Sequence, residues 1–288
     1  LRNPNRIIKG YGPTPTPQLA LFAHLGQVDK VKKLVGAGAD PNILDQNAGS
    51  ALLNALQGGD DACFWALLPV TSLEVINSRT EGGKSPLLEA ISGGKEDLVQ
   101  GLLARGADTE IRGRLQKTAL FEAVEQFADP NTLVQTAIHT GLASADLPVV
   151  LRKTTSPFPD EEVFAQSLSD YSLDELAILP ELAEHFLKGD NPSARLLVRY
   201  LLDSGADVNA VVGEAKLTPF LYAAEIGNPW LLKALIDHGA DIRSRDVRGG
   251  TVLSRLHFFG HSGLAPNVLG WVRPSDRIWL RETAMLTR

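Results

Sequence analysis

Residues 216–227 read KLTPFLYAAEIG and residues 231–241 read LLKALIDHGAD, and together they decide the fold of the chain. Thr218 can cap a helix with its hydroxyl oxygen, and Pro219 suits the first helical position, where no N–H group is needed. Gly227 can end one helix because glycine accepts a positive φ without steric cost, and Gly239 can end the next in the same way. The stretch therefore predicts two short helices joined by a turn.

The same pattern recurs along the chain at a regular interval. The Gly-Ala-Asp triplet that closes the quoted stretch also ends at Asp40, Asp108 and Asp207. Asp207 and Asp241 are 34 residues apart, and Asp40 and Asp108 are 68 apart, which is two such periods. A helix pair with one apolar face cannot bury that face alone, so successive pairs are expected to stack on one another.

This pattern resembles the ankyrin repeat, which has a Thr-Pro turn, a short helix, a glycine, a second apolar helix and Gly-Ala-Asp, with a period of about 33 residues. The resemblance implies an all-α ankyrin-repeat solenoid of about seven stacked helix-turn-helix pairs with hairpin loops, interrupted by an irregular segment. The expected organisation is an extended lead-in over 1–16, about four repeats over 17–138, an irregular insertion or degenerate repeat over 139–171, about three repeats over 172–273 with the last one capping, and a tail over 274–288 that covers the last apolar face.

Three stretches depart from the family pattern. Residues 69–77 (PVTSLEVIN) replace Gly-Ala-Asp at the end of repeat two, and the preceding helix has to stop before the proline. Phe127 stands where repeat four needs a helix-ending glycine, although a second helix is still expected over 131–138. Residues 139–171 lack the pattern altogether, so they are expected to protrude from the solenoid or bend it.

The length of the irregular segment fits both a degenerate repeat and an insertion. Asp108 and Asp207 are 99 residues apart, or three periods, so residues 139–171 take up about one repeat's length. Repeat five is then expected to have its first helix over 182–187 and its second over 196–201. The irregular segment is either a degenerate repeat or an insertion that has replaced one.

Composition and charge narrow the functional classes. Hydrophobic residues make up 44% of the chain, and no apolar run reaches the length of a membrane-spanning helix. The net charge of -6 argues against nucleic acid as a partner, since binding a polyanion needs a cluster of Lys and Arg. Cys63 is the single cysteine of the chain, which excludes an internal disulfide framework.

The compartment is only loosely indicated. A single thiol suits a reducing compartment, and the chain starts at Leu1 and not at methionine. We therefore expect a processed or shortened form, with a cytoplasmic location favoured and an exported or periplasmic one left open, because a signal peptide could have been removed. The chain is expected to be monomeric by itself.

Two motifs could suggest chemistry, and the repeat pattern explains both more simply. Residues 82–85, GGKS, imitate the end of a phosphate-binding loop, but Ser78 stands where that motif needs another glycine. The repeat register makes Gly83 a hairpin glycine and the next serine a helix start. Cys63 falls on a helix that is expected to be buried, where a packed thiol is inert.

Metal binding and catalysis find little support in the sequence. His257 and His261 are four residues apart, but Gly260 is expected to end the helix between them, and no third ligand is evident. No Gly-x-Ser-x-Gly nucleophile motif is present. The sequence therefore predicts no catalytic residue, no cofactor and no metal site.

The implied function is recognition of another protein. In the ankyrin family, the hairpin loops and the exposed faces of the first helices usually make the contacts with partners. The resemblance thus implies a non-enzymatic protein–protein interaction module that binds a protein partner through its concave face and loops. The expected contacts are a basic rim on the loops and an acidic floor on the first helices, with a tyrosine as aromatic anchor: Arg112, Arg114, Arg243, Arg245 and Arg248 for the rim, and Glu89, Glu122, Glu125, Tyr222 and Glu225 for the floor.

Two alternatives remain open. One is a dedicated inhibitor or immunity-type protein, for example of bacterial origin, that blocks a partner enzyme. The other is an enzyme or small-ligand binder whose site is formed by residues 139–171. A stoichiometric protein partner would favour binding or inhibition, and a deep polar pocket beside residues 139–171 would favour the enzyme.

Overall fold

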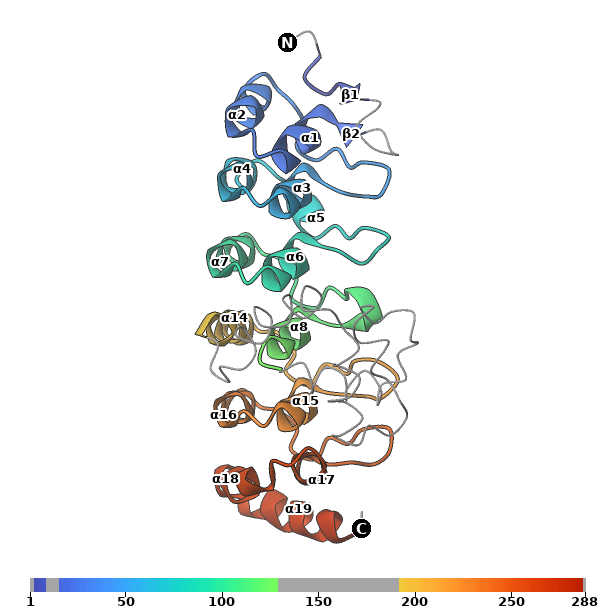
Figure 1. The fold of residues 1–288 in the computed structure, drawn as a ribbon, viewed down its shortest axis with the longest axis vertical. Coiled ribbons are helices and arrows are strands. Elements are labelled where there is room, and N and C mark those ends of the chain that lie inside the picture. The colour runs from blue at the N-terminus through green and yellow to red at the C-terminus, as the bar shows by residue number, and fades with distance from the viewer. Residues whose placement is uncertain (1–2, 9–15, 129–191, 287–288) are drawn as a thin grey trace, which may run out of the picture. The chain divides into compact units, whose positions relative to one another are not determined.

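Antiparallel helix pairs build the protein in a computed structural model that describes residues 3–8, 16–128 and 192–286 (Figure 1). These residues group into two compact units. Unit 1 holds the described residues up to Ala123 together with Leu196–Asp207. Unit 2 holds the described residues from Val124 to Arg195 and from Val208 onward. The all-α fold that the sequence predicts is confirmed.

Unit 1 contains the first three repeats. Their first helices stack in one layer and their second helices in another (Figure 1). The apolar core lies between the two layers. Phe64, Leu87 and Leu102 are fully buried in this core. The three pairs are α1 (Gln18–His24) with α2 (Val28–Gly36), α3 (Ala51–Gly58) with α4 (Asp61–Leu67), and α6 (Pro86–Ser92) with α7 (Glu96–Ala104).

Two segments of unit 1 differ from the expected pattern. In place of Gly-Ala-Asp, the short helix α5 (Leu73–Ile76) follows α4, which ends before Pro69 as predicted. The hydroxyl of Thr71 donates to the Leu67 carbonyl at 2.9 Å, which satisfies an acceptor at the end of α4. At the expected extended lead-in, β1 (Ile7–Ile8) pairs with β2 (Thr16–Pro17) in antiparallel fashion, a pairing that the sequence did not predict.

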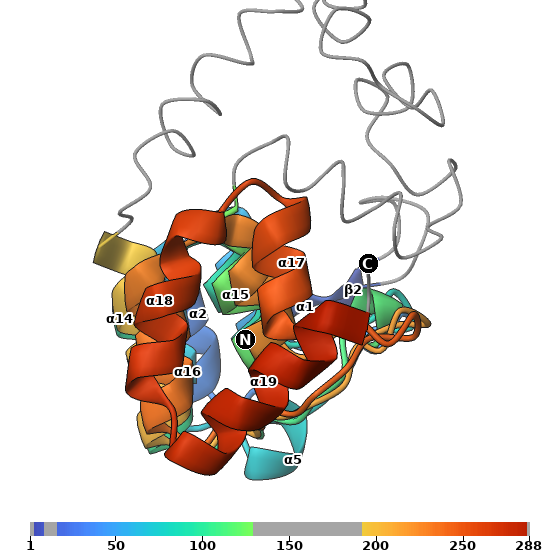
Figure 2. The ribbon, with the colours of Figure 1, turned by 90° about the horizontal axis from the view of Figure 1, so that it is seen from below.

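Unit 2 contains the last two repeats. Its elements are α15 (Pro219–Ile226) and α16 (Pro229–Asp237), then α17 (Val252–Phe258), the 3-10 helix η3 (Ser262–Leu264), α18 (Ala265–Trp271) and α19 (Pro274–Leu286). The expected tail is thus the helix α19, which packs against α17 (Figure 2) and buries Leu280 completely.

The helix boundaries follow the local signals of the sequence. The Thr218 hydroxyl oxygen accepts a hydrogen bond from the Leu221 N–H at 3.2 Å, and Pro219 occupies the first helical position. The φ angles of Gly227 and Gly239 are 72° and 88°, so both helices end in the left-handed region, as predicted. The same capping begins α6, where the Ser85 hydroxyl oxygen accepts from the Leu88 N–H at 3.3 Å.

Hydrogen bonds between consecutive repeats show where the central repeat continues. The side-chain oxygen of Asn77 accepts from the Asp108 N–H at 2.9 Å, and that of Asn209 accepts from the Asp241 N–H at 2.7 Å. In unit 1 a Glu110 carboxylate oxygen takes the same role and accepts from the Asp207 N–H at 2.9 Å, across 97 residues. Asp207 therefore occupies the position, relative to Glu110, that Asp108 occupies relative to Asn77, at the end of the following repeat.

That repeat is made by α8 (Ala119–Glu125), which follows the short 3-10 helix η1 (Arg114–Gln116), and by α14 (Pro192–Asp203). In unit 2, a residue that follows the C-terminal end of α8 and a residue near the N-terminal end of α14 contact the same indole ring. Phe127 stacks on Trp230 with ring centroids 5.8 Å apart, and the Arg195 guanidinium lies 5.0 Å from the same ring. We infer that α8 and α14 are the two helices of a single repeat.

The predicted repeat count bears on this pairing. The fifth repeat was expected to have its second helix over 196–201, which falls within α14, and the Asp207–Glu110 hydrogen bond supports the pairing of α14 with α8 that we infer. The described elements fit six helix pairs, where about seven were expected. The helices expected over 131–138 and 182–187, and the irregular segment 139–171 with its expected protrusion, lie outside the described residues.

The close approach of α1 to α3 makes Gly58 a sensitive position. A Cβ atom there would overlap the carbonyl oxygen of His24, and a backbone atom cannot rotate away. We expect Gly58→Ala to lower the free energy of unfolding by about 1–3 kcal/mol, as overpacking does. Gly36→Ala on α2 is the control, because nothing lies within 4 Å of its Cβ position. Equal melting temperatures for the two variants would contradict the packing.

Candidate functional site

Two neighbouring hairpin loops of unit 1 carry one part of the expected rim. We call residues 77–85 finger 1 and residues 108–118 finger 2. The Arg79 guanidinium of finger 1 donates to the Arg112 carbonyl at 2.5 Å, and the Arg112 guanidinium donates to the Gln116 carbonyl at 2.9 Å. The two fingers therefore lie side by side, with Arg112 half-buried and Arg114 exposed on finger 2.

The expected acidic floor adjoins these fingers. Lys84 of finger 1 pairs with Glu89 of α6, with Nζ and Oε2 3.3 Å apart. A Cβ atom at Gly113 of finger 2 would lie 3.0 Å from Oε1 of Glu122, so this carboxylate is close to the finger backbone. Both glutamates are half-buried. Within unit 1, the structure thus brings rim and floor together.

The floor is different in unit 2. Glu125, at the end of α8, is half-buried, but Tyr222 and Glu225 are 0% exposed. The expectation that Tyr222 and Glu225 line an accessible surface is therefore wrong. Helix α15 is apolar on nearly every side, and α17 packs directly against it, so these side chains point into the protein.

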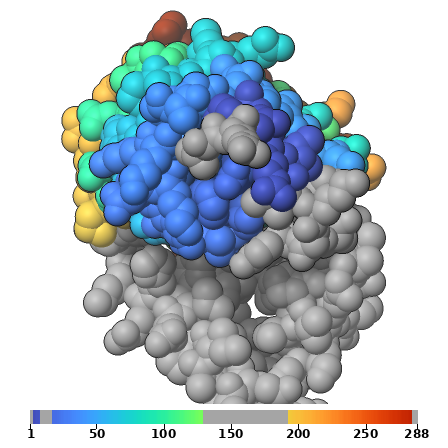
Figure 3. Space-filling view, turned by 90° about the horizontal axis from the view of Figure 1, so that it is seen from above, coloured from blue at the N-terminus to red at the C-terminus, as the bar shows by residue number. Residues whose placement is uncertain are grey.

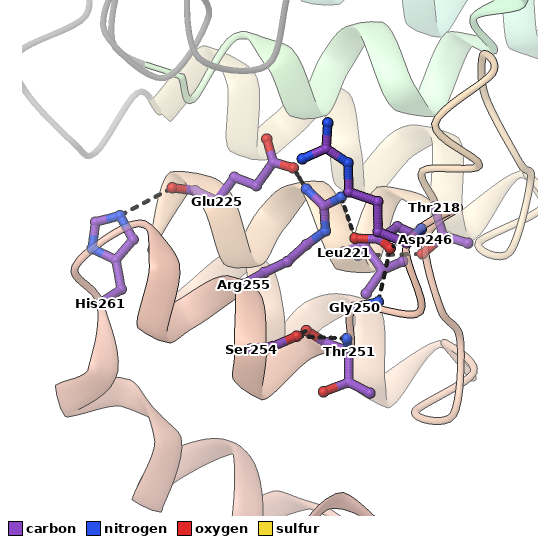
Figure 4. Close-up of polar contacts among 10 residues, drawn as sticks. Thr218, Leu221, Glu225, Asp246, Gly250, Thr251, Ser254, Arg255 and His261 are labelled. Atoms are coloured by element: carbon purple, nitrogen blue, oxygen red, sulfur yellow. Dashed lines mark hydrogen bonds and ion pairs between the residues drawn. The ribbon is translucent and has the colours of Figure 1, made fainter. Parts of the chain in front are cut away.

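Glu225 belongs to a buried charge network that sequence reasoning missed (Figure 4). Arg255 of α17 pairs with the Glu225 carboxylate through one guanidinium nitrogen, and with Oδ2 of Asp246 at 2.6 Å through the other. The second Asp246 oxygen accepts from the N–H groups of Arg248 and Gly250 at 2.7 and 2.8 Å. The network therefore fixes the loop of residues 241–251, which we call finger 3, to the core of unit 2.

Burial shapes the electrostatics of this network. Loss of water around the guanidinium lowers the pKa of Arg255 to about 10. The guanidinium still carries its charge at neutral pH, and its two carboxylate partners favour that charged form. The available sequence signal was a glutamate in an otherwise apolar helix, with an arginine in the first helix of the next repeat.

The arginines of finger 3 have different surroundings. Arg243 donates from Nε to Oδ1 of Asp276 in α19 at 2.9 Å. The guanidinium carbons of Arg243 and Arg245 lie 5.8 and 5.1 Å from the centre of the Trp279 ring. Arg248 is exposed on the same finger. Of the three rim arginines expected here, Arg243 is thus already engaged by the last helix.

The other sequence candidates take structural positions. Cys63 is fully buried, and burial raises the pKa of its thiol. Gly83 has a φ of 80° in the hairpin before α6, as the repeat register predicts. Nδ1 of His257 lies 3.1 Å from the Ser262 hydroxyl, and Nε2 of His261 lies 3.0 Å from the Glu225 carbonyl.

The described residues contain neither a candidate metal cluster nor a candidate membrane-spanning helix. Over residues 3–8, 16–128 and 192–286, no three His, Cys, Asp or Glu side chains are grouped to hold a metal ion. Within those same ranges, no helix is long and apolar enough to span a bilayer.

Comparison with known proteins matches this geometry to one family. The profile described as Ankyrin repeats (3 copies) matches residues 19–113, and the profile described as Ankyrin repeat matches residues 216–244. An ankyrin repeat domain from Acinetobacter baumannii AYE superimposes with a TM-score of 0.59 at 17% identity, over 88% of this chain and 96% of that one. The chain contains ankyrin repeats.

Curated relatives share the repeats with this ankyrin-repeat protein over a small part of their own length. The E3 ubiquitin-protein ligase KEG of Arabidopsis thaliana is 24% identical over 249 residues, which is 80% of this chain and 15% of the ligase. Neurogenic locus notch homolog protein 4 of Homo sapiens is 37% identical over 99 residues, which is 34% of this chain and 5% of that protein. These similarities indicate shared repeats.

Proposed function

We propose that this ankyrin-repeat protein binds another protein through fingers 1 and 2 and the adjoining helices α6 and α8. Ankyrin repeats are protein–protein interaction modules, and the fold is typically non-enzymatic. The observation that carries the proposal is the meeting of rim and floor in unit 1. Exposed Arg114 lies on finger 2, and the Glu122 carboxylate lies beside the same finger.

The charges of this surface indicate the chemistry of the partner. Positive side chains of the fingers lie close to carboxylates of the first helices, as in the Lys84–Glu89 pair. A protein with charges of both signs can complement such a surface, whereas a polyanion would meet the two glutamates. Rim charges mainly change the rate of association, since they steer the partners toward each other before contact.

The test compares two charge reversals of equal size. Arg112→Glu with Arg114→Glu changes finger 2, and Lys32→Glu with Lys33→Glu makes the same change in net charge on exposed positions of α2. Helix α2 belongs to the first repeat, whose rounded end faces the viewer in Figure 3. A partner captured by the unaltered chain should associate roughly tenfold more slowly with the finger 2 variant and nearly unchanged with the α2 variant, as measured by surface plasmon resonance.

Equal association rates for both variants would place the binding surface elsewhere and refute the proposal. If the captured partner is an enzyme, its activity with and without the chain separates plain binding from inhibition. Circular dichroism of each variant shows whether its helices are retained.

A further inference from the structure

Two arginines of finger 3 lie over the ring of Trp279 in α19. Arg243 and Arg245 both lie within cation–π distance of its ring, and Arg248 is exposed nearby in sequence. Residues 241–250 and 273–282 together contain six arginines and four acidic residues, on a chain with a net charge of -6. Two of the four acids are already engaged, because Asp246 holds Arg255 and Asp276 holds Arg243. This surface is therefore basic against an acidic background.

One arginine that lies over this ring already binds a carboxylate of the chain. Asp276 accepts a hydrogen bond from Nε of Arg243 at 2.9 Å while that guanidinium lies over Trp279. Arg245 has the same support from the ring, and its guanidinium donates a hydrogen bond to the Gly249 carbonyl at 3.3 Å. Among the ion pairs of the two units, none includes Arg245 or Arg248. One carboxylate position is thus filled and a second is open.

We propose that finger 3 and α19 bind an acidic peptide segment of a protein partner, with carboxylates held by Arg245 and Arg248. A guanidinium stacked on an aromatic ring keeps its N–H edge available, and this planar edge matches a carboxylate. The ring also limits the motion of Arg245, so less conformational entropy is lost on binding. Val247, which is 57% exposed between the two arginines, adds an apolar contact.

The number and arrangement of the charges favour a peptide over a polyanion. Nucleic acids are bound through many phosphate contacts along a continuous basic surface. Here the open arginines are only Arg245 and Arg248, and the same segments also carry exposed Asp241 and Glu282, so no continuous basic surface is formed. One or two carboxylates suit this site better. The site uses residues of unit 2, whereas fingers 1 and 2 belong to unit 1, so the inference stands whether or not the proposed function does.

Fluorescence anisotropy with labelled peptides tests the proposal on the whole chain. The probes are eight-residue peptides carrying two glutamates one to four residues apart, with glutamine versions as neutral controls. At least one acidic peptide should bind, and Arg245→Gln should weaken that binding roughly tenfold, as expected for the loss of a charge-assisted contact. Arg281→Gln is the matched control, because it removes the same charge from an exposed position of α19, whereas the Arg245 guanidinium lies over the Trp279 ring.

A second variant should increase affinity, which damage to the fold could not do. Asp276→Asn removes the carboxylate that occupies Arg243, so a second supported arginine becomes available to the peptide. We expect this variant to bind the acidic peptide roughly three- to tenfold more tightly, with a weaker effect at high salt.

Three outcomes would overturn the proposal. The first is no binding of any acidic peptide at about 1 mM. The second is equal affinity of the unaltered chain, Arg245→Gln and Asp276→Asn for the peptide. The third is an oligonucleotide that binds through the same arginines more tightly than the peptides do, which would assign the surface to a nucleic acid.

Discussion

Arg255→Met is expected to lower the free energy of unfolding of unit 2 by about 3–5 kcal/mol, the cost of breaking a buried ion pair from one side. Methionine fills a similar volume, but the Glu225 and Asp246 carboxylates would lose their shared cation in a site that excludes water. Finger 3 should loosen as well, because Asp246 connects its backbone to Arg255. Urea unfolding followed by circular dichroism measures the loss.

A triple variant separates charge from packing in this prediction. Arg255→Met with Glu225→Gln and Asp246→Asn removes every formal charge of the network. The new asparagine still offers an oxygen to the Arg248 and Gly250 N–H groups. Most of the lost stability should return, since neutral groups are far less costly to bury than unpaired carboxylates. A triple variant no more stable than Arg255→Met would show that the arginine acts through shape alone.

Leu102→Ala is the other change with a large expected effect, about 2–5 kcal/mol in unit 1. Leu102 is 0% exposed in α7, so its removal leaves a cavity between the helix layers. Repeat proteins are held by contacts between neighbours, so the damage should be local. Hydrogen exchange should show the greatest loss of protection in the repeats built from α3 to α8, and little in unit 2.

Leu103→Ala is a control on the same helix, because Leu103 is only half-buried and a smaller cavity results. It should cost clearly less stability than Leu102→Ala. A uniform loss of protection from α1 to α19 would mean that the chain unfolds as one cooperative block. That result would contradict the nearest-neighbour account of its stability.

Sequence reasoning succeeded where the signal is local. Thr218 and Pro219 begin α15, and Gly227 ends it, because capping and a positive φ depend on those residues and their immediate neighbours. The same physics placed the start of α6 at Ser85. A helix boundary can therefore be read from a few residues without knowing what packs around them.

The exposure of a side chain could not be predicted in this way. Tyr222 and Glu225 occupy the same helix as the correctly placed caps, yet both are buried. Their burial depends on α17, whose Arg255 comes from the next repeat and supplies the charge that Glu225 needs. Glu89 and Glu122, on the first helices α6 and α8, are instead half-buried beside the fingers.

The split repeat was missed because its length imitates the repeat period. The 99 residues from Asp108 to Asp207 suggest three regular repeats, and no local signal in α14 identifies its partner. The hydrogen bond from the Asp207 N–H to Glu110 instead supports the inference that α8 and α14 share one repeat. Counting triplets cannot separate three repeats from one repeat that contains a long insertion.

This arrangement has a consequence for synthesis on the ribosome. Helix α8 is made before the 66 residues 126–191, and α14 only after them. At about 5–20 residues per second, α8 waits roughly 3–13 s for its partner. During that interval the first three repeats can fold, but the apolar side of α8 that α14 will cover has no partner. The nascent chain therefore has a defined window in which a chaperone could bind this helix.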